Sequence, residues 1–285
     1  MHNFKNILYM ELRKAFCNHL FIIALMFGII LSIISGISAV TNYFSTREML
    51  NFIGGNPMIE AFGLYNSWLG GESNSLGFTL FYVFFSFIAV LPYGWSYQAE
   101  ECNGYSKYVS VKIGRKKYLL AKYIAAFLSG GTVVLIPLIL NFIGVACFVP
   151  AVQPSIVYEM YYAMRQGAIW SDIFYTHPLV FVCLYLLIDF IYGGLFAVIG
   201  IAVSLFSKKR LVVVLTPFLI TMSMQYVRSF LIPIVHKEVA PIYFLHTTTI
   251  QNVADGKIIM AEGLIILIVT LAIVLWKGSK WEDLQ

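Results

Sequence analysis

Long apolar runs alternate with short polar segments along the whole chain, and this pattern predicts a helical membrane protein. A helix needs about 20 apolar residues to cross the hydrocarbon core of a bilayer. The runs of sufficient length cover residues 20–40, 76–97, 118–149, 178–206, 211–235 and 258–276. We therefore expect an all-α, polytopic membrane protein with six transmembrane helices, folded as a single domain over residues 1–285.

Composition supports this fold class. Hydrophobic residues make up 60% of the chain and charged residues only 12%, whereas soluble domains carry about 25% charged residues. So few charges cannot cover a water-soluble fold of this size, and the excess apolar surface is expected to face lipid. The net charge of +5 does not indicate a nucleic-acid partner, because the basic residues lie between apolar runs instead of clustering on a soluble face.

The basic residues are distributed unevenly between the two sides of the predicted bundle. Fourteen of the nineteen lysines and arginines lie before the first run, after the last run, or around the segments that follow the second and fourth runs. The five on the other side are Arg47, Arg165, Arg228, Lys237 and Lys257. Cytoplasmic segments of membrane proteins carry the excess of Lys and Arg. We therefore predict a multi-pass protein of the cell membrane with both termini in the cytoplasm.

The segment before the first run has apolar residues at helical spacing. These are Phe4, Ile7, Leu8, Leu12, Ala15 and Phe16. The spacing predicts a helix lying in the membrane interface, although Glu11 interrupts its apolar arc. The alternative is an ordinary basic flank that only sets topology.

The loop over residues 98–118 is the most informative stretch. Glu100 and Glu101 close the second run, and Gly104 and Gly114 bracket a short amphipathic segment. We expect a helix over residues 105–113, whose apolar members are Tyr105, Tyr108, Val109 and Ile113. Such a helix suits docking of a soluble partner; the alternative is a basic loop that only sets topology. If it docks, Tyr108 and Val109 are the expected anchors, with Glu101 and Arg115 as polar partners at the rim.

This layout resembles the permease subunit of type 2 ATP-binding-cassette transporters. Members of that family have an interfacial N-terminal helix, six spans, and a first cytosolic loop with acidic residues, a glycine, a short coupling helix, and a small residue followed by Arg. The corresponding positions here are Glu101, Gly104, residues 105–113, Gly114 and Arg115, followed by Tyr118 and Lys122. Two positions depart from the pattern: Gly114 stands where Pro is frequent, and Tyr105 where Thr is frequent.

The resemblance implies half of an exporter. It implies that Glu101, Gly104, Tyr105, Tyr108, Val109, Ile113 and Arg115 couple the chain to a separate ATPase subunit, which binds ATP and Mg. It also implies a second permease copy or paralogue and an amphipathic or apolar substrate such as a peptide, drug or lipid. The segment 229–255 is similar in kind to the short re-entrant helices that the family has between its last two spans.

Absent motifs agree with a non-enzymatic subunit. The chain has no G-x-x-x-x-G-K-[ST] phosphate loop and no H-E-x-x-H metalloprotease motif. The five histidines are scattered, and no catalytic set is indicated by spacing. We therefore expect no catalytic residue, no metal site and no cofactor bound by this chain.

Asp189 and Arg228 are charged residues inside apolar runs, where charge is costly. Asp189 lies deep in the fourth run and Arg228 in the fifth. From the outer end they differ in depth by about 6 Å at ~1.5 Å per residue, so a structural pair between them is one reading, and a protonated Asp189 is another. The functional reading is a substrate contact or proton relay, which would make the protein a proton-coupled secondary transporter. A non-transporting immunity or sensor protein is a third class.

The four cysteines, Cys17, Cys102, Cys147 and Cys183, show no metal-binding or C-x-x-C spacing. We expect packed, unreactive thiols.

Overall fold

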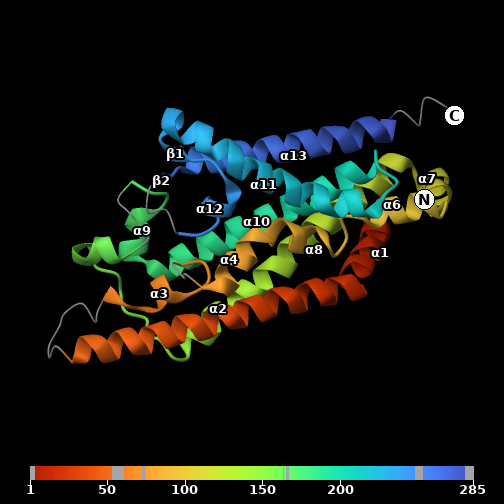
Figure 1. The fold of residues 1–285 in the computed structure, drawn as a ribbon. Coiled ribbons are helices and arrows are strands. Elements are labelled where there is room, and N and C mark those ends of the chain that lie inside the picture. The colour runs from red at the N-terminus through yellow and green to blue at the C-terminus, as the bar shows by residue number, and fades with distance from the viewer. Residues whose placement is uncertain are drawn as a thin grey trace.

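The computed structural model describes residues 4–52, 61–71, 75–162, 164, 167–247 and 253–279. They form an elongated bundle of helices (Figure 1). Its main helices are α1 (Phe4–Phe16), α2 (His19–Asn51), α8 (Arg115–Ala146), α10 (Pro178–Ser204), α11 (Arg210–Val235) and α13 (Gly256–Ser279). Among the described residues, five helices are long and apolar enough to cross a membrane: α2, α8, α10, α11 and α13. The fold is therefore that of an all-α, multi-pass membrane protein, as the sequence predicts.

Four of the predicted runs correspond closely to single helices, but α2 is much longer than expected. It continues beyond residue 40 to Asn51, because the polar residues after the first run do not stop a helix. At ~1.5 Å per residue, its 33 residues reach about 50 Å, well over the ~30 Å of a hydrocarbon core.

The second predicted span is not a single helix. It consists of α4 (Leu76–Val83), α5 (Phe85–Val90) and α6 (Ser96–Cys102), which follow one another along the bundle. Phe84 leaves the helical conformation with φ −90° and ψ 6°, and a turn at residues 91–95 includes Pro92, which cannot donate a backbone hydrogen bond. Continuous apolarity predicted the run's extent but not these two breaks.

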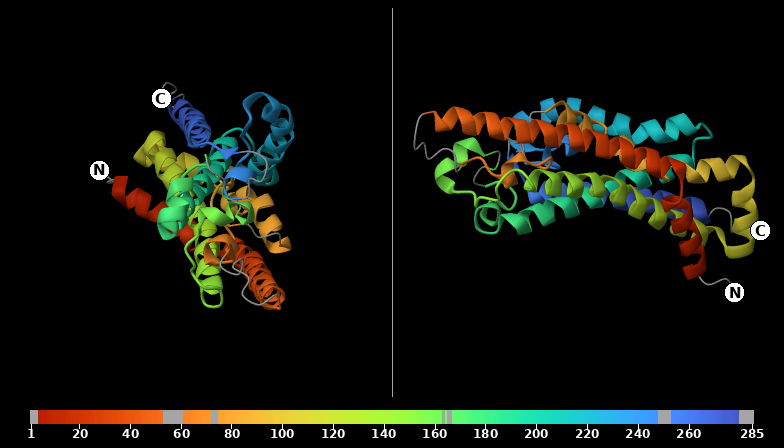
Figure 2. Two further views of the ribbon diagram at one scale, coloured as in Figure 1. Left: turned by 90° about the vertical axis from the view of Figure 1, so that its left-hand side faces the viewer. Right: turned by 90° about the horizontal axis from the view of Figure 1, so that it is seen from below.

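The bundle has two unlike ends (Figures 1 and 2). The first, which we call the α7 end, holds α1, α6, the short helix α7 (Tyr105–Ile113) and the end of α13. The described termini thus share one end of the bundle. At the opposite end, which we call the far end, lie α3 (Leu64–Ser67), the 3-10 helix η2 (Ile156–Tyr161), α9 (Ser171–Thr176), α12 (Pro241–Phe244), β1 (Lys237–Glu238) and β2 (Val253–Ala254). The two short strands pair in parallel. Arg165 falls outside the described residues.

The core forms around α10, which contacts α5, α8, α11 and α13. Helices α8 and α10 approach each other closely at Gly130 and Gly193: a Cβ added at Gly130 would lie 2.9 Å from the carbonyl oxygen of Gly193. Small residues at such crossings let membrane helices pack backbone to backbone. In contrast, α2, α11 and α13 keep many large apolar side chains exposed, as expected for surfaces that face lipid.

The prediction that the four cysteines are packed in the core is wrong. All four are exposed free thiols. Position within an apolar run does not determine whether a side chain points to the core or outward, since a spanning helix is apolar on both faces.

Candidate functional site

The helix α7 has the bounds predicted for the coupling segment, Tyr105–Ile113. Its flanking residues are Gly104 with φ 71° and Gly114 with φ 91°. A backbone with positive φ strains most L residues but not glycine. The two glycines therefore allow the chain to turn sharply out of α6, form α7 across the end of the bundle, and turn again into α8.

The two faces of α7 divide differently from the prediction. Val109 is only 5% exposed and packs in a cluster with tyrosines of α6 and α8. Tyr108 and Val111 point outward, with 66% and 67% of their surfaces exposed, and Tyr105 is partly exposed. The predicted anchor Val109 is thus a core residue, since Ser106, Val109 and Ile113 share the inward face. Tyr108 and Val111 form the apolar part of the outward face.

Glu101 and Arg115 are not free rim charges either. Glu101 accepts hydrogen bonds from Tyr97, at 3.0 Å, and from Ser106. Arg115 donates to the hydroxyl of Tyr97 at 3.0 Å. These contacts join α6, α7 and the start of α8, so the two charged residues hold α7 in place.

Behind this junction lies a group of four charges, which we call the charge network: the buried Glu11 and Lys122 and the partly buried Lys14 and Glu100. The ammonium of Lys122 is 2.9 Å from Glu11 and 3.0 Å from Glu100. The ammonium of Lys14 is 3.0 Å from each of the same two carboxylates. Charges of opposite sign alternate around the network, so it is neutral overall and ties α1, α6 and α8 together.

Hydroxyl groups complete the network. Tyr93 donates to Glu11, and Tyr118 donates to Glu100. Lys122, which is 0% exposed, donates further to Tyr93 at 3.2 Å and to Ser96 at 3.3 Å. Buried charges are tolerated when their remaining donors and acceptors are satisfied in this way.

The electrostatics of the network favour its charged form. Burial would raise the pKa of the Glu11 carboxyl, but Lys122, Lys14 and the hydrogen bond from Tyr93 outweigh it and hold that pKa below its usual value. Burial likewise opposes the charge on Lys14, yet Glu11 and Glu100 raise its pKa above the usual value. Both groups therefore stay ionised at neutral pH.

Sequence reasoning missed this network, although a signal was present. Glu11 interrupts the apolar arc of the N-terminal segment, and the structure puts it on the buried stripe of α1 between Ile7 and Ala15. Lys122 lies inside the third apolar run. A lone acid on one apolar face and a lone base in another indicate a buried pair, but sequence does not tell which partners meet.

Arg228 and Asp189 do not pair with each other. Arg228 donates to both carboxylate oxygens of Glu238, at 2.7 and 2.8 Å, and its guanidinium lies 4.0 Å from the centre of the Tyr243 ring. Asp189 is 0% exposed, and neither of its carboxylate oxygens has a hydrogen-bond partner among the described residues. The structural pair between Asp189 and Arg228, one of the readings left open by the sequence, does not form, because Arg228 pairs with Glu238 instead.

A polar cavity of about 340 Å³ opens beside α7, between α6 and the segment after α10. Its lining includes Glu101, Arg115, Lys208 and Lys277. The outward face of α7 and this cavity lie at the same end of the bundle.

The chain was compared with protein-family models, with curated proteins and with solved structures, and none of them matches it.

Proposed function

We propose that this chain is the permease subunit of an ATP-binding-cassette exporter in the cytoplasmic membrane, with both termini and α7 in the cytosol. The observation that carries the proposal is the arrangement of α7. Its outward face presents Tyr108 and Val111 to a partner, while its inward face is fixed to α6 and α8. A docking surface held by such a junction can receive force and pass it on.

The transmitting path is short. Val109 and Ser106 connect α7 to α6 and α8, and the charge network connects α6 and α8 to α1. Closure of two ATPase subunits, each holding ATP and Mg, would push on α7. Packed elements respond to such a push by switching between discrete arrangements, so α1, α6 and α8 are expected to move together.

The remaining helices supply half of a two-part transporter. Helices α4, α5 and α6 together make up a sixth, broken span, which gives half of a two-part transporter. A second permease copy or a paralogue completes it, with the exposed apolar faces of α2 and α11 shared between partner and lipid. The substrate is amphipathic or apolar, and it moves outward.

The test separates docking from folding. Tyr108→Asp combined with Val111→Asp should abolish co-purification of the proposed ATPase subunit and its coupled ATPase activity in liposomes, because interfaces depend on a few apolar anchors. Membrane insertion should be unchanged, since both side chains already face water. The matched control is Tyr108→Phe with Val111→Ile, which keeps both anchors. If the double Asp variant still retains the ATPase subunit and its coupled activity, α7 is not a docking surface and its basic residues only set the topology.

One observation favours a second function. Asp189 is buried and has no hydrogen-bond partner within the described part of the chain, and intramembrane carboxyl groups mark proton pathways in transporters. On this reading the protein is a proton-coupled secondary transporter. Efflux from liposomes that follows the proton gradient and needs no ATP would select it over the exporter.

A further inference from the structure

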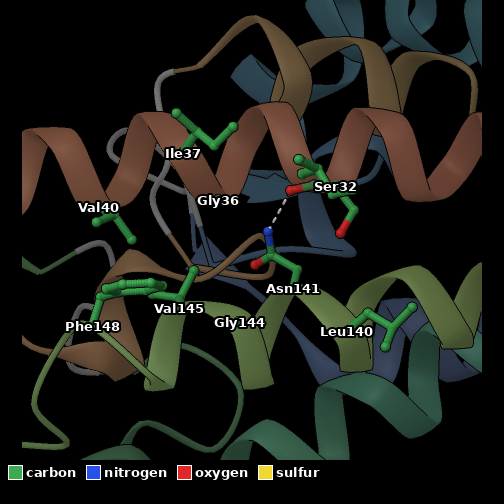
Figure 3. Close-up of a pocket in the computed structure, with 10 residues that line it drawn as sticks. Ser32, Gly36, Ile37, Val40, Leu140, Asn141, Gly144, Val145 and Phe148 are labelled. Carbon is green, nitrogen blue, oxygen red and sulfur yellow. Dashed lines mark hydrogen bonds between the residues drawn. The ribbon is translucent and has the colours of Figure 1, made fainter.

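A groove runs along the seam between α2 and α8, in the half of the bundle nearer the far end (Figure 3). It encloses about 310 Å³ and is walled by Ile33, Ile37, Val40, Leu140 and Phe148. Most of these side chains are exposed to the bundle's surroundings. The groove is therefore open to the membrane and not to the interior of the protein.

Two features keep the groove open and apolar. The polar atoms of Asn141 are both bonded to backbone groups. Its amide nitrogen donates to Ser32 O at 2.8 Å (Figure 3), and its amide oxygen accepts from Leu69 N at 2.7 Å. Gly144 leaves space, since a Cβ added there would meet nothing within 4 Å. An occupant of this part of the groove thus finds only apolar surface.

The groove continues toward the far end into a second cavity of about 510 Å³. Phe148 lines both cavities, and the second one adds Tyr43 and Arg47 of α2. Arg47 is exposed and forms no ion pair within the part of the chain that the structure describes. Along α2, Arg47 lies fourteen positions after Ile33, a rise of about 21 Å at ~1.5 Å per residue.

We propose that this seam binds an anionic lipid from the leaflet nearest the far end. Half of a hydrocarbon core is about 15 Å thick, so an acyl chain along Ile33–Val40 leaves the lipid headgroup at the depth of Arg47. Basic side chains at that depth attract anionic headgroups. A soluble ligand would leave the apolar seam unused, and a zwitterionic lipid would bring no net negative charge to Arg47.

The experiment uses the full chain in vesicles that contain phosphatidylglycerol or phosphatidylcholine, each with a photoreactive group near the end of one acyl chain. Crosslinked peptides are identified by mass spectrometry. We expect more crosslinks to the α2 and α8 residues of the seam than to the lipid-facing residues of α11 and α13. The anionic lipid should be favoured about fivefold, the effect of one interfacial cation.

Two variants distinguish recognition of the lipid headgroup from binding of the acyl chain. Arg47→Gln should remove the fivefold preference, whereas Lys257→Gln, an exposed lysine at the same end but outside the groove, should keep it. Gly144→Leu should lower crosslinking of both lipids, because it fills the seam, and it suits a helix better than glycine does. Ile143→Phe adds volume to the same helix outside the groove and should have no effect.

Three results would overturn the proposal: crosslinks spread evenly over the lipid-facing helices, equal capture of the two lipids by the unchanged chain, or unchanged seam crosslinking in Gly144→Leu. If Gly144→Leu fails to insert, Arg47→Gln decides, since its exposed side chain is not needed for packing. None of these outcomes depends on transport or on an ATPase partner.

Discussion

The charge network at the α7 end, centred on Glu11 and Lys122, and Asp189 in the middle of α10 both place charged side chains in the core, but only the network compensates the cost of burial with partners of opposite charge. In the network, each of the two carboxylates lies 3.0 Å or less from two ammonium groups and accepts a tyrosine hydroxyl as well. Asp189 has no partner among the described residues. The first site is complete as it stands, and the second is not.

This difference separates structural charge from candidate functional charge. Replacing a complete buried network by apolar residues can be neutral, whereas removing one member leaves an uncompensated charge. Replacing Asp189 leaves no oppositely charged residue without its partner, so the replacement should not lower the free energy of unfolding. The presence of a carboxyl group at position 189 then needs another reason, and a role in transport is the one that can be measured.

The largest effect is expected from Lys122→Met. This change removes the ammonium that bridges Glu11 and Glu100 while keeping most of the side-chain volume. Breaking a buried ion pair costs about 3–5 kcal/mol, and the free energy of unfolding in detergent should fall by that amount. Lys117→Met, at an exposed position on the same helix, should change it by less than about 0.5 kcal/mol. Equal losses in the free energy of unfolding for the two substitutions would show that Lys122 stabilises the fold no more than an exposed lysine does.

A medium effect that depends on pH is expected from Glu11→Gln. The pKa of Glu11 is lower in the folded chain than its ordinary value of 4.5, so its charge contributes stability that is present above that value and is lost as the pH falls through the folded pKa. At neutral pH the variant should lose about 1.5–3 kcal/mol, the range for a hydrogen bond to a charged group.

The pH profile provides the control. The difference in stability between the unchanged chain and Glu11→Gln should be constant from pH 8 to about pH 5 and should shrink below the unfolded pKa. Glu48→Gln, at an exposed position on α2, should show no such profile. If this difference in stability grew as the pH fell, the lowered pKa of Glu11 in the folded chain would be contradicted.

The smallest change in stability is expected at Asp189. Asp189→Leu removes a buried group without a partner and should leave the free energy of unfolding unchanged or raise it by about 1 kcal/mol. Asp189→Asn should keep ATP-driven efflux in liposomes, since an amide retains hydrogen-bonding capacity without charge. Loss of efflux in Asp189→Asn with normal stability, together with dependence on a proton gradient, would favour the secondary transporter instead.

Much of the fold was readable from the chain. The helix Tyr105–Ile113 was predicted because two glycines bracket an amphipathic segment, and α1 was predicted from helical spacing. Hydropathy located five spanning helices but not the breaks at Phe84 and residues 91–95, because apolar residues suit broken and unbroken helices alike. The orientation of α7 was also misread: Val109 and Tyr108 are neighbours of similar character, and only one of them packs inward.

The sequence by itself determined what depends on local order and composition: an apolar bundle, its approximate spans, and a short helix at a glycine-bounded turn. Tertiary structure alone decided which charges meet. Glu11, Glu100 and Lys122 come from three separate helices, and Arg228 finds Glu238 instead of Asp189. The physical reason is that an ion pair needs atoms within about 4 Å, a distance fixed by how helices pack and not by their separation along the chain.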